Sequence, residues 1–293
     1  LGLGAVLGMP ASATLCGRVG ARRVIIGGAI GLTLVLPLLA LVDSAFGLGA
    51  CLLVFGASIG AIDVAANIHG TEVQDAADEP LMSGFHGLYS VGGLVGASAM
   101  TAAIAAGLPV FAAAALAAAV ILACIVAAAP GFFANKAAAS HPLFVVPRGS
   151  VLVIGLLAMV VFLAEGAMLD WGALLLTQVK GVEVALSGAG YALFALAMTL
   201  VRLVGDRIVA RTGERAMLVG GILLTAVGMA ITALAEPFIL VVLGIAIAGL
   251  AVGNVVPVLF TLAGRQRAMP ASHAIAAASI LGYLGVLVGP ALV

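Results

Sequence analysis

The chain has 293 residues, of which 64% are hydrophobic and 8% charged. An ordinary soluble domain is about a quarter charged, so this chain has too few charges to cover a water-facing surface, and a soluble globular fold is excluded. Twelve basic and twelve acidic residues cancel, which argues against a nucleic-acid-binding protein, because that function needs a basic surface.

Apolar segments follow one another along the whole chain. A bilayer core takes about 20 apolar residues per helix, so there is room for roughly ten spans. We interpret the segments as helices, because barrel strands would show alternating hydrophobicity instead. The sequence thus predicts an all-α polytopic membrane protein with spans near residues 1–16, 24–42, 47–69, 84–107, 110–131, 150–176, 185–204, 216–235, 238–263 and 271–293.

The basic residues are sorted between the two sides of the membrane. Assigning the connections to alternating sides leaves only Lys180 on one face and the other eleven basic residues on the opposite one. This bias identifies the second face as cytoplasmic. The eleven residues expected there are Arg18, Arg22, Arg23, Lys136, Arg148, Arg202, Arg207, Arg211, Arg215, Arg265 and Arg267.

Two polar stretches interrupt the apolar pattern. Residues 71–80 contain four acidic side chains and are expected to form a solvated cytoplasmic loop. Residues 132–149, which contain Pro142, Pro147 and Arg148, form the longest polar connection. They predict a boundary between a helix bundle at 1–131 and a second bundle at 150–293.

The two halves of the chain repeat at a constant offset of 193 residues. An internal repeat of this kind indicates two related structural units. Both copies of the Arg-x-Gly-x-Arg loop fall on the cytoplasmic side, so the repeat is parallel, an arrangement found in transporters with a site between the halves. A complete repeat has twelve helices, and we expect this chain to be a fragment that lacks the first and the last. The matches are Arg18, Gly20 and Arg22 with Arg211, Gly213 and Arg215; Gly27, Gly28, Gly56 and Gly60 with Gly220, Gly221, Gly249 and Gly253; and Gly92, Leu94, Val95 and Gly96 with Gly285, Leu287, Val288 and Gly289.

With these loops the chain resembles the major facilitator superfamily (MFS). The second copy, Gly205-Asp206-Arg207 followed by Arg211, Gly213 and Arg215, is similar to that family's signature loop. The first copy departs from it, with Cys16-Gly17 where an acidic residue is expected before Arg18. The resemblance implies a latch between the halves on the cytoplasmic side. The gate candidates that it implies are Arg18, Arg22, Asp206, Arg207, Arg211 and Arg215, and the alternative is that the arginines only set the topology.

Three further segments resemble a bacterial subgroup of the family that is related to fucose-permease-type sugar/proton symporters. They are residues 63–67, 82–90 and 165–171. The resemblance implies a proton-coupled transporter of small solutes in the bacterial inner membrane, and we expect it to act as a monomer. The Gly-Pro signature of drug antiporters is absent from residues 87–96, which makes that subclass a weaker alternative.

Two carboxylates lie inside apolar segments, where a charge requires water, a partner or a bound proton. Asp63 shares one helix face with Gly56, Gly60 and Asn67, while Glu165 lies toward the outer end of its segment. A carboxylate that binds a proton when its cavity closes and releases it when water enters can carry protons. The alternative is a structural hydrogen bond to a neighbouring helix.

Three more polar residues complete the expected substrate and proton pathway. His86 can pair with Asp63 or with the acidic stretch, or can simply be hydrated near the interface. Asn254 precedes Pro257 and predicts a broken helix that lines a binding site, the alternative being an interhelical hydrogen bond. Tyr191 can present a hydroxyl group to a substrate.

Secondary active transport by alternating access is therefore the predicted function. A membrane enzyme is excluded by the lack of a catalytic motif, and a phosphate-binding loop is also absent. Cys16, Cys51 and Cys124 have no metal-site spacing, so no metal or cofactor is expected. A non-transporting membrane sensor or an inactive truncated transporter remains as the alternative.

Overall fold

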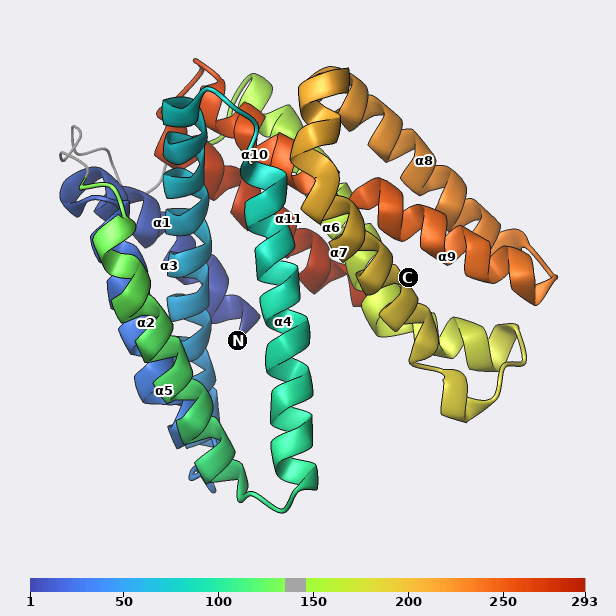
Figure 1. Cartoon of the computed structure of the whole chain (residues 1–293), viewed down its shortest axis with the longest axis horizontal. Helices are drawn as coiled ribbons and strands as arrows, with labels where there is room; N and C mark the ends of the chain where they lie inside the picture. The colour runs from blue at the N-terminus through green and yellow to red at the C-terminus, as the bar shows by residue number, and fades with distance from the viewer. Residues whose placement is uncertain (135–145, 293) are drawn as a thin grey trace. The chain divides into compact units, whose positions relative to one another are not determined.

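The computed structural model describes residues 1–134 and 146–292, with the side chains of 290–292 left out. Within these ranges the chain is helical and contains no β-strand (Figure 1). This agrees with the rule that a helix satisfies its own backbone hydrogen bonds in lipid. The α-helices are α1 (Gly2–Val19), α2 (Ala21–Leu38), α3 (Ala45–Ala77), α4 (Met82–Ala105), α5 (Val110–Ala128), α6 (Ser150–Leu174), α7 (Ala189–Thr212), α8 (Glu214–Leu234), α9 (Phe238–Val252), α10 (Val255–Arg265) and α11 (Ala271–Leu292).

Nine helical segments of the described chain are long and apolar enough to cross a membrane. They coincide with nine of the ten expected spans, and the all-α polytopic fold is confirmed. The remaining span, α1, falls outside the nine because its glycines, its hydroxyl residues and Arg18 lower its hydropathy. A short π-helix, η2 (Leu175–Val179), extends α6, and 3-10 turns lie at η1 (Ala129–Gly131) and η3 (Val184–Leu186).

Two helix boundaries differ from those expected, and one expected break is present. Helix α3 continues to Ala77, so the first part of the acidic stretch at 71–80 is helical rather than a loop. Helix α7 extends to Thr212 and contains Arg202, which had been assigned to a connection. The expected span at 238–263 is divided into α9 and α10 around Gly253 and Asn254. Charged residues thus lie on helix ends that apolar content alone does not detect.

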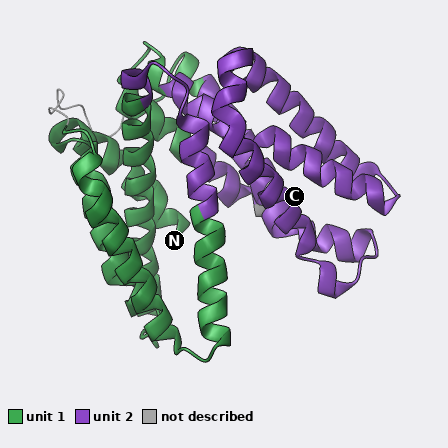
Figure 2. Ribbon diagram, viewed as in Figure 1, with its two compact units in different colours: residues 1–73, 92–152, 264–280 green, residues 74–91, 153–263, 281–293 purple. Residues whose placement is uncertain are grey.

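The chain folds as two compact units (Figure 2). Unit 1 comprises residues 1–73, 92–152 and 264–280, and unit 2 comprises residues 74–91, 153–263 and 281–293. Each unit combines segments from both predicted halves, so long-range packing contributes to both. In unit 1, α2 packs along α5; in unit 2, α9 packs against α7 and α8. Part of the connection at 132–149, including Lys136 and Pro142, lies outside the described residues.

The 193-residue repeat is visible in the backbone. Gly20 separates α1 from α2 with φ 87° and ψ 151°, and Gly213 separates α7 from α8 with φ 81° and ψ 157°. Positive φ values of this kind are accessible to glycine at little cost, because other residues have a Cβ that clashes. The two Arg-x-Gly-x-Arg loops therefore make the same tight connection between successive helices.

Glycine packing repeats at the same offset. A Cβ on Gly56 would meet the carbonyl oxygen of Leu1, and a Cβ on Gly249 would meet that of Phe194. Likewise a Cβ on Gly28 would meet Ile62, and a Cβ on Gly221 would meet Val255. Each partner pair is again 193 residues apart. Small residues permit such close approach of membrane helices, so at these positions the sequence repeat is also a repeat of helix-packing contacts.

Gly228 tests the importance of such close helix packing at a position outside the repeat. A Cβ there would lie 2.5 Å from the backbone nitrogen of Ala248 on α9, whereas a Cβ on Gly220 of the same helix meets nothing within 4 Å. We expect Gly228→Ala to destabilise the detergent-solubilised protein by about 1–3 kcal/mol, because backbone atoms have to move apart. Thermal unfolding of the purified variants measures this. The matched control Gly220→Ala should unfold at or above the parent temperature, and equal behaviour of both variants would contradict tight packing.

Candidate functional site

Asp63 on α3 is held by side chains from two helices of unit 1. The hydroxyl of Ser279 on α11 donates a 2.9 Å hydrogen bond to Oδ2 of Asp63. The side-chain amide of Asn67 donates to the backbone oxygen of Asp63 at 2.9 Å and lies 3.4 Å from its Oδ1. The predicted polar stripe on α3 therefore meets a hydroxyl group from a distant part of the sequence.

Sequence reasoning did not identify Ser279. It is fully buried within an alanine-rich stretch of α11, where a single serine is an unremarkable small residue. The repeat provided an available signal, because Ser279 lies 193 residues after His86, itself a candidate. Because both equivalent positions hold a polar residue, the repeat indicates that this position tolerates polar side chains in both halves.

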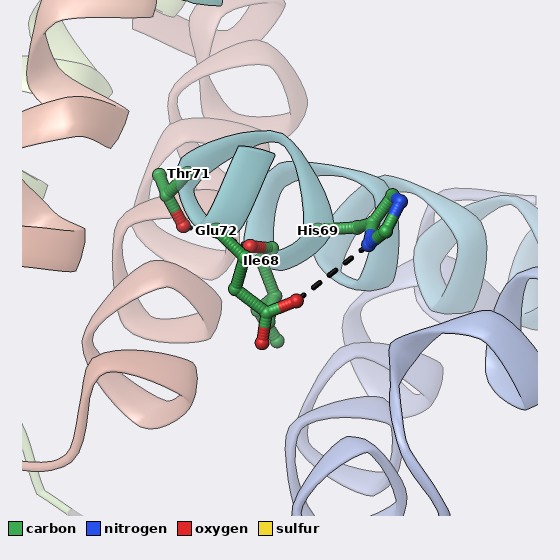
Figure 3. Close-up of polar contacts among 4 residues, drawn as sticks. All are labelled: Ile68, His69, Thr71 and Glu72. Atoms are coloured by element: carbon green, nitrogen blue, oxygen red, sulfur yellow. Dashed lines mark hydrogen bonds and ion pairs between the residues drawn. The ribbon is translucent and has the colours of Figure 1, made fainter. Parts of the chain in front are cut away.

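His69 lies on the last turns of α3, beyond Asp63. Its Nδ1 is 3.5 Å from Oε2 of Glu72, and Figure 3 shows the two side chains facing each other on one side of the helix. The imidazole ring makes edge contacts with Phe132 and Phe133, at centroid distances of 5.3 and 5.5 Å. The hydroxyl of Thr71 donates to the backbone oxygen of Ile68 within the same turn. The α3 residues around His69 are thus packed and polar, whereas residues 75–79 of the acidic stretch are exposed, as expected of a solvated segment.

Asp206 on α7 caps the N-terminus of α4 in unit 2. Its Oδ1 accepts a 2.9 Å hydrogen bond from the backbone N–H of Ser83, and its Oδ2 accepts one of 2.8 Å from that of Gly84. The first N–H groups of a helix lack partners within the helix, and the helix dipole favours negative charge at this end. Asp206 therefore joins two helices from different predicted halves of the chain.

The neighbouring N–H groups at the start of α4 are also bound. Oε1 of Gln74, near the end of α3, accepts hydrogen bonds from the N–H groups of Leu81 and Met82 at 2.9 and 3.2 Å. The amide of Gln74 in turn donates to the hydroxyl of Thr261 on α10 at 3.2 Å. Gln74 was not among the predicted residues, because a single glutamine beside an acidic stretch resembles a solvated surface residue.

Two glycines allow this close approach. A Cβ on Gly84 would lie 2.7 Å from Oδ2 of Asp206, and a Cβ on Gly205 would overlap Oδ1 of Asn254 and come within 2.6 Å of Cβ of Ser83. The Gly205-Asp206 pair thus places the carboxylate and leaves room for the neighbouring helices. The arginines that were predicted to form the gate together with Asp206 lie nearer the surface. Exposed side chains are found at Arg18, Arg207, Arg211 and Arg215, and Arg22 is half-buried.

Hydrogen bonds in both directions join the break between α9 and α10 to α7. Asn254, which is 1% exposed, donates from Nδ2 to the carbonyl oxygen of Val201 at 3.2 Å. Its Oδ1 has no hydrogen-bond partner among the described residues. The break leaves backbone groups without helical partners. One of them, the carbonyl oxygen of Gly253, accepts a 2.9 Å hydrogen bond from Nε of Arg202. Asn254 and Pro257 correctly predicted the broken helix.

Arg202 is not a cytoplasmic loop residue, which corrects the topology assignment for this one arginine. Its side chain is 5% exposed and lies within α7. Nε donates to Gly253, and Nη1 donates to the hydroxyl of Ser90 on α4 at 2.8 Å. The expected span at 185–204 ended just beyond it, and counting every arginine as a topology signal concealed its position inside the helix.

Glu165, Tyr191 and His86 also lie in unit 2. Glu165 on α6 is half-buried, and both Glu165 and Tyr191 interact electrostatically with Arg202. The Tyr191 ring stacks on Phe194 within α7. His86 stacks on Phe260 of α10 with ring centroids 5.6 Å apart. Two of the predicted pathway residues therefore share the environment of one buried guanidinium.

No cluster of three or more histidine, cysteine or acidic side chains suitable for a metal ion occurs among the described residues. The polar groups described above are instead arranged as hydrogen-bond donors and acceptors between helices. Their chemistry is suited to binding a polar solute or a proton.

Comparisons with known proteins agree with this architecture. The family model described as Major Facilitator Superfamily matches residues 1–290. An uncharacterized MFS-type transporter of Yersinia pestis is 44% identical over 292 residues, which cover 99% of this chain and 76% of that protein. The human organic anion transporter MFSD10 has the same fold, with a TM-score of 0.78 and 19% identity over 99% of this chain and 75% of that one. The E. coli fucose:proton symporter FucP gives a TM-score of 0.69 at 13% identity, covering 99% and 81%.

The Asp63–Ser279 hydrogen bond should be measurable as a coupling energy. We expect Ser279→Ala to cost about 1 kcal/mol more in the parent than in an Asp63→Ala background, because only the parent loses the bond. Thermal or denaturant unfolding in detergent gives the four stabilities of this cycle. The exposed Ser98→Ala serves as control and should show no coupling. Additive effects of the Asp63 and Ser279 changes would contradict the contact.

Proposed function

Since this chain belongs to the major facilitator superfamily, we propose that it is a proton-coupled secondary transporter that moves a small solute by alternating access. Members of this family are multi-pass membrane proteins that bind small-molecule substrates. The parallel repeat supports rocking of two bundles, residues 1–131 and 150–293, about a site near the midplane. We place the protein in a bacterial inner membrane as a monomer. The shared fold of a fucose:proton symporter supports the coupling to protons.

The observation that carries the proposal is the contact of Asp206 with the N-terminus of α4. It joins a helix of the second predicted bundle to a helix of the first. A carboxylate at a helix N-terminus gains from both hydrogen bonds and the helix dipole, and it loses both when the helices separate. We propose that this contact is the cytoplasmic latch, broken and remade in each transport cycle, with the exposed Arg207, Arg211 and Arg215 beside it.

Weakening the latch should expose the buried start of α4. In a variant without native cysteines, Ser83→Cys introduces a thiol at a position that is 2% exposed. We expect Asp206→Asn to raise its labelling rate with a membrane-impermeant maleimide several-fold, because the neutral amide retains one acceptor oxygen and loses the charge. Labelling from the cytoplasmic side of inverted vesicles measures this.

Gly84→Ala tests the same contact without changing any charge. Its new Cβ would displace Oδ2 of Asp206, so it should increase labelling as Asp206→Asn does. Gly92→Ala on the same helix is the matched control, because a Cβ there meets nothing within 4 Å. Unchanged labelling in both Asp206→Asn and Gly84→Ala would leave these residues without a gating role.

Asp63 and Glu165 are the proposed proton carriers. Each carboxylate lies within a membrane-spanning helix, where an ionised group is costly and a neutral, protonated one is not. Asp63 has hydrogen-bonding partners from two helices, and Glu165 lies near Arg202. Movement of the bundles would change the hydration of each group, and hence its affinity for a proton.

Proton coupling can be separated from solute movement. In proteoliposomes containing a pH-sensitive dye, we expect Asp63→Asn or Glu165→Gln to reduce solute-driven proton uptake at least tenfold. Exchange of solute across the membrane should continue, because exchange needs no net proton transfer. The exposed Asp170→Asn on α6 is the control and should behave as the parent. If solute-driven proton uptake persists in both variants, neither carboxylate carries the proton.

A further inference from the structure

Arg202 is a permanently charged side chain buried in a membrane-spanning helix. It is 5% exposed and lies within α7. Charged residues in such positions are rare, since they are costly in a bilayer, and they pair with another charge or take part in function. Its guanidinium is protonated in every ordinary protein environment, so the charge cannot be removed by loss of a proton.

The hydrogen bonds of Arg202 within the described chain go to neutral groups. Nε donates to the carbonyl oxygen of Gly253 at 2.9 Å, and Nη1 donates to the hydroxyl of Ser90 at 2.8 Å. A guanidinium has five N–H donors. No carboxylate of the described residues lies within 4 Å of the group, and three of its N–H donors, both on Nη2 among them, remain without a partner there.

The stabilisation of the broken helix does not account for this arrangement. The carbonyl oxygen of Gly253 needs one N–H donor, which a glutamine or lysine could provide. Arg202 supplies that donor and retains a full positive charge and a free planar edge. Nη2 is not among the fully enclosed polar atoms that lack a partner in the described chain, so it faces accessible space. The unused part of the group is therefore not sealed inside the packed helices.

The surroundings complete a set of groups suited to an anion. Glu165 on α6, Tyr89 on α4 and Tyr191 on α7 interact electrostatically with Arg202. Tyrosine hydroxyls donate hydrogen bonds to carboxylate oxygens, and the planar guanidinium matches a carboxylate with two parallel N–H···O bonds. All four residues belong to unit 2.

We propose that Arg202 binds the carboxylate of the transported solute, which makes the substrate a small organic anion. This inference rests on the proposed transport function and specifies the substrate class of the same pathway. Tyr191 positions the anion beside Arg202. Glu165 competes with it for the positive charge, so the anion binds best when Glu165 carries a proton, and anion and proton move together.

Matched pairs of probes test the charge requirement. Succinate, benzoate and lactate are each compared with the corresponding neutral amide, using the full chain purified in detergent and reconstituted in proteoliposomes. A ligand that binds the folded state raises its unfolding temperature. We expect at least one carboxylate to stabilise the protein and to be taken up, and its amide to do neither.

Arg202 variants connect that response to this residue. Arg202→Gln keeps a donor for Gly253 and removes the charge, and it should reduce binding of the carboxylate at least a hundredfold. Arg202→Lys keeps the charge without the planar edge and should retain part of the binding. Glu165→Gln should increase the affinity several-fold, because the competing negative charge is lost. Arg23→Gln, an exposed arginine outside the proposed site, is the control and should match the parent.

Several outcomes would overturn the inference. If a neutral solute is transported and Arg202→Gln transports it equally well, the substrate is not an anion bound by Arg202, and the transport function stands. If the folded parent moves neither charged nor neutral solutes, the transport function itself fails. If both Arg202 variants fail to fold, the comparison of each carboxylate with its amide in the parent protein tests the inference. Equal stabilisation and equal uptake of the two would exclude a charge-specific site.

Discussion

A polar group inside a membrane protein has to find its partner within the protein, because lipid offers none. This constraint accounts for the arrangement of unit 2. The break between α9 and α10 frees backbone groups, and Arg202 of α7 donates to one of them, the carbonyl oxygen of Gly253, while Asn254 in the break donates to Val201 of α7. The N-terminus of α4 presents unpaired N–H groups, and Asp206 and Gln74 accept from four of them. Interruptions in the helices thus fix the positions of the polar residues.

The same constraint makes these contacts suitable for movement. A helix N-terminus that leaves Asp206 must be solvated, so we expect two favourable arrangements of the two helices, in contact or each exposed to water. Because Gly84 and Gly205 have no side chain, α4 and α7 can approach closely while in contact, and no side chain there would block water when they separate. The latch that we propose, one carboxylate and two backbone N–H groups, would therefore open without breaking the packed apolar core.

The sequence predicted the helices, the repeat and the residues that are polar within apolar segments, since hydropathy and spacing determine these features directly. Asp63, Asp206 and Asn254 were identified on that basis. Their partners were not, because Ser279, Gln74 and the N-terminus of α4 come together only through long-range packing. Arg202 was misplaced for a different reason: it lies two residues before the end of the expected span at 185–204 and was counted with the connecting arginines, whereas α7 continues to Thr212. At helix ends, the apolar content of the sequence does not show which residues are buried.

Several polar residues buried within the helices occupy positions at which the two halves differ, while Gly28, Gly56, Gly221 and Gly249 occupy positions at which they agree. At the offset of 193 residues, Asp63 corresponds to Val256, Arg202 to Met9, Asp206 to Ala13 and Asn254 to Ala61. Ser279, which contacts Asp63, corresponds to His86, which stacks on Phe260, itself the counterpart of Asn67. The repeat therefore supplies a common helix framework with equivalent contact points. In each of these equivalent pairs only one of the two halves has the charged or amide side chain. If both halves had it, the second copy would place a like charge in an equivalent environment that holds no partner for it.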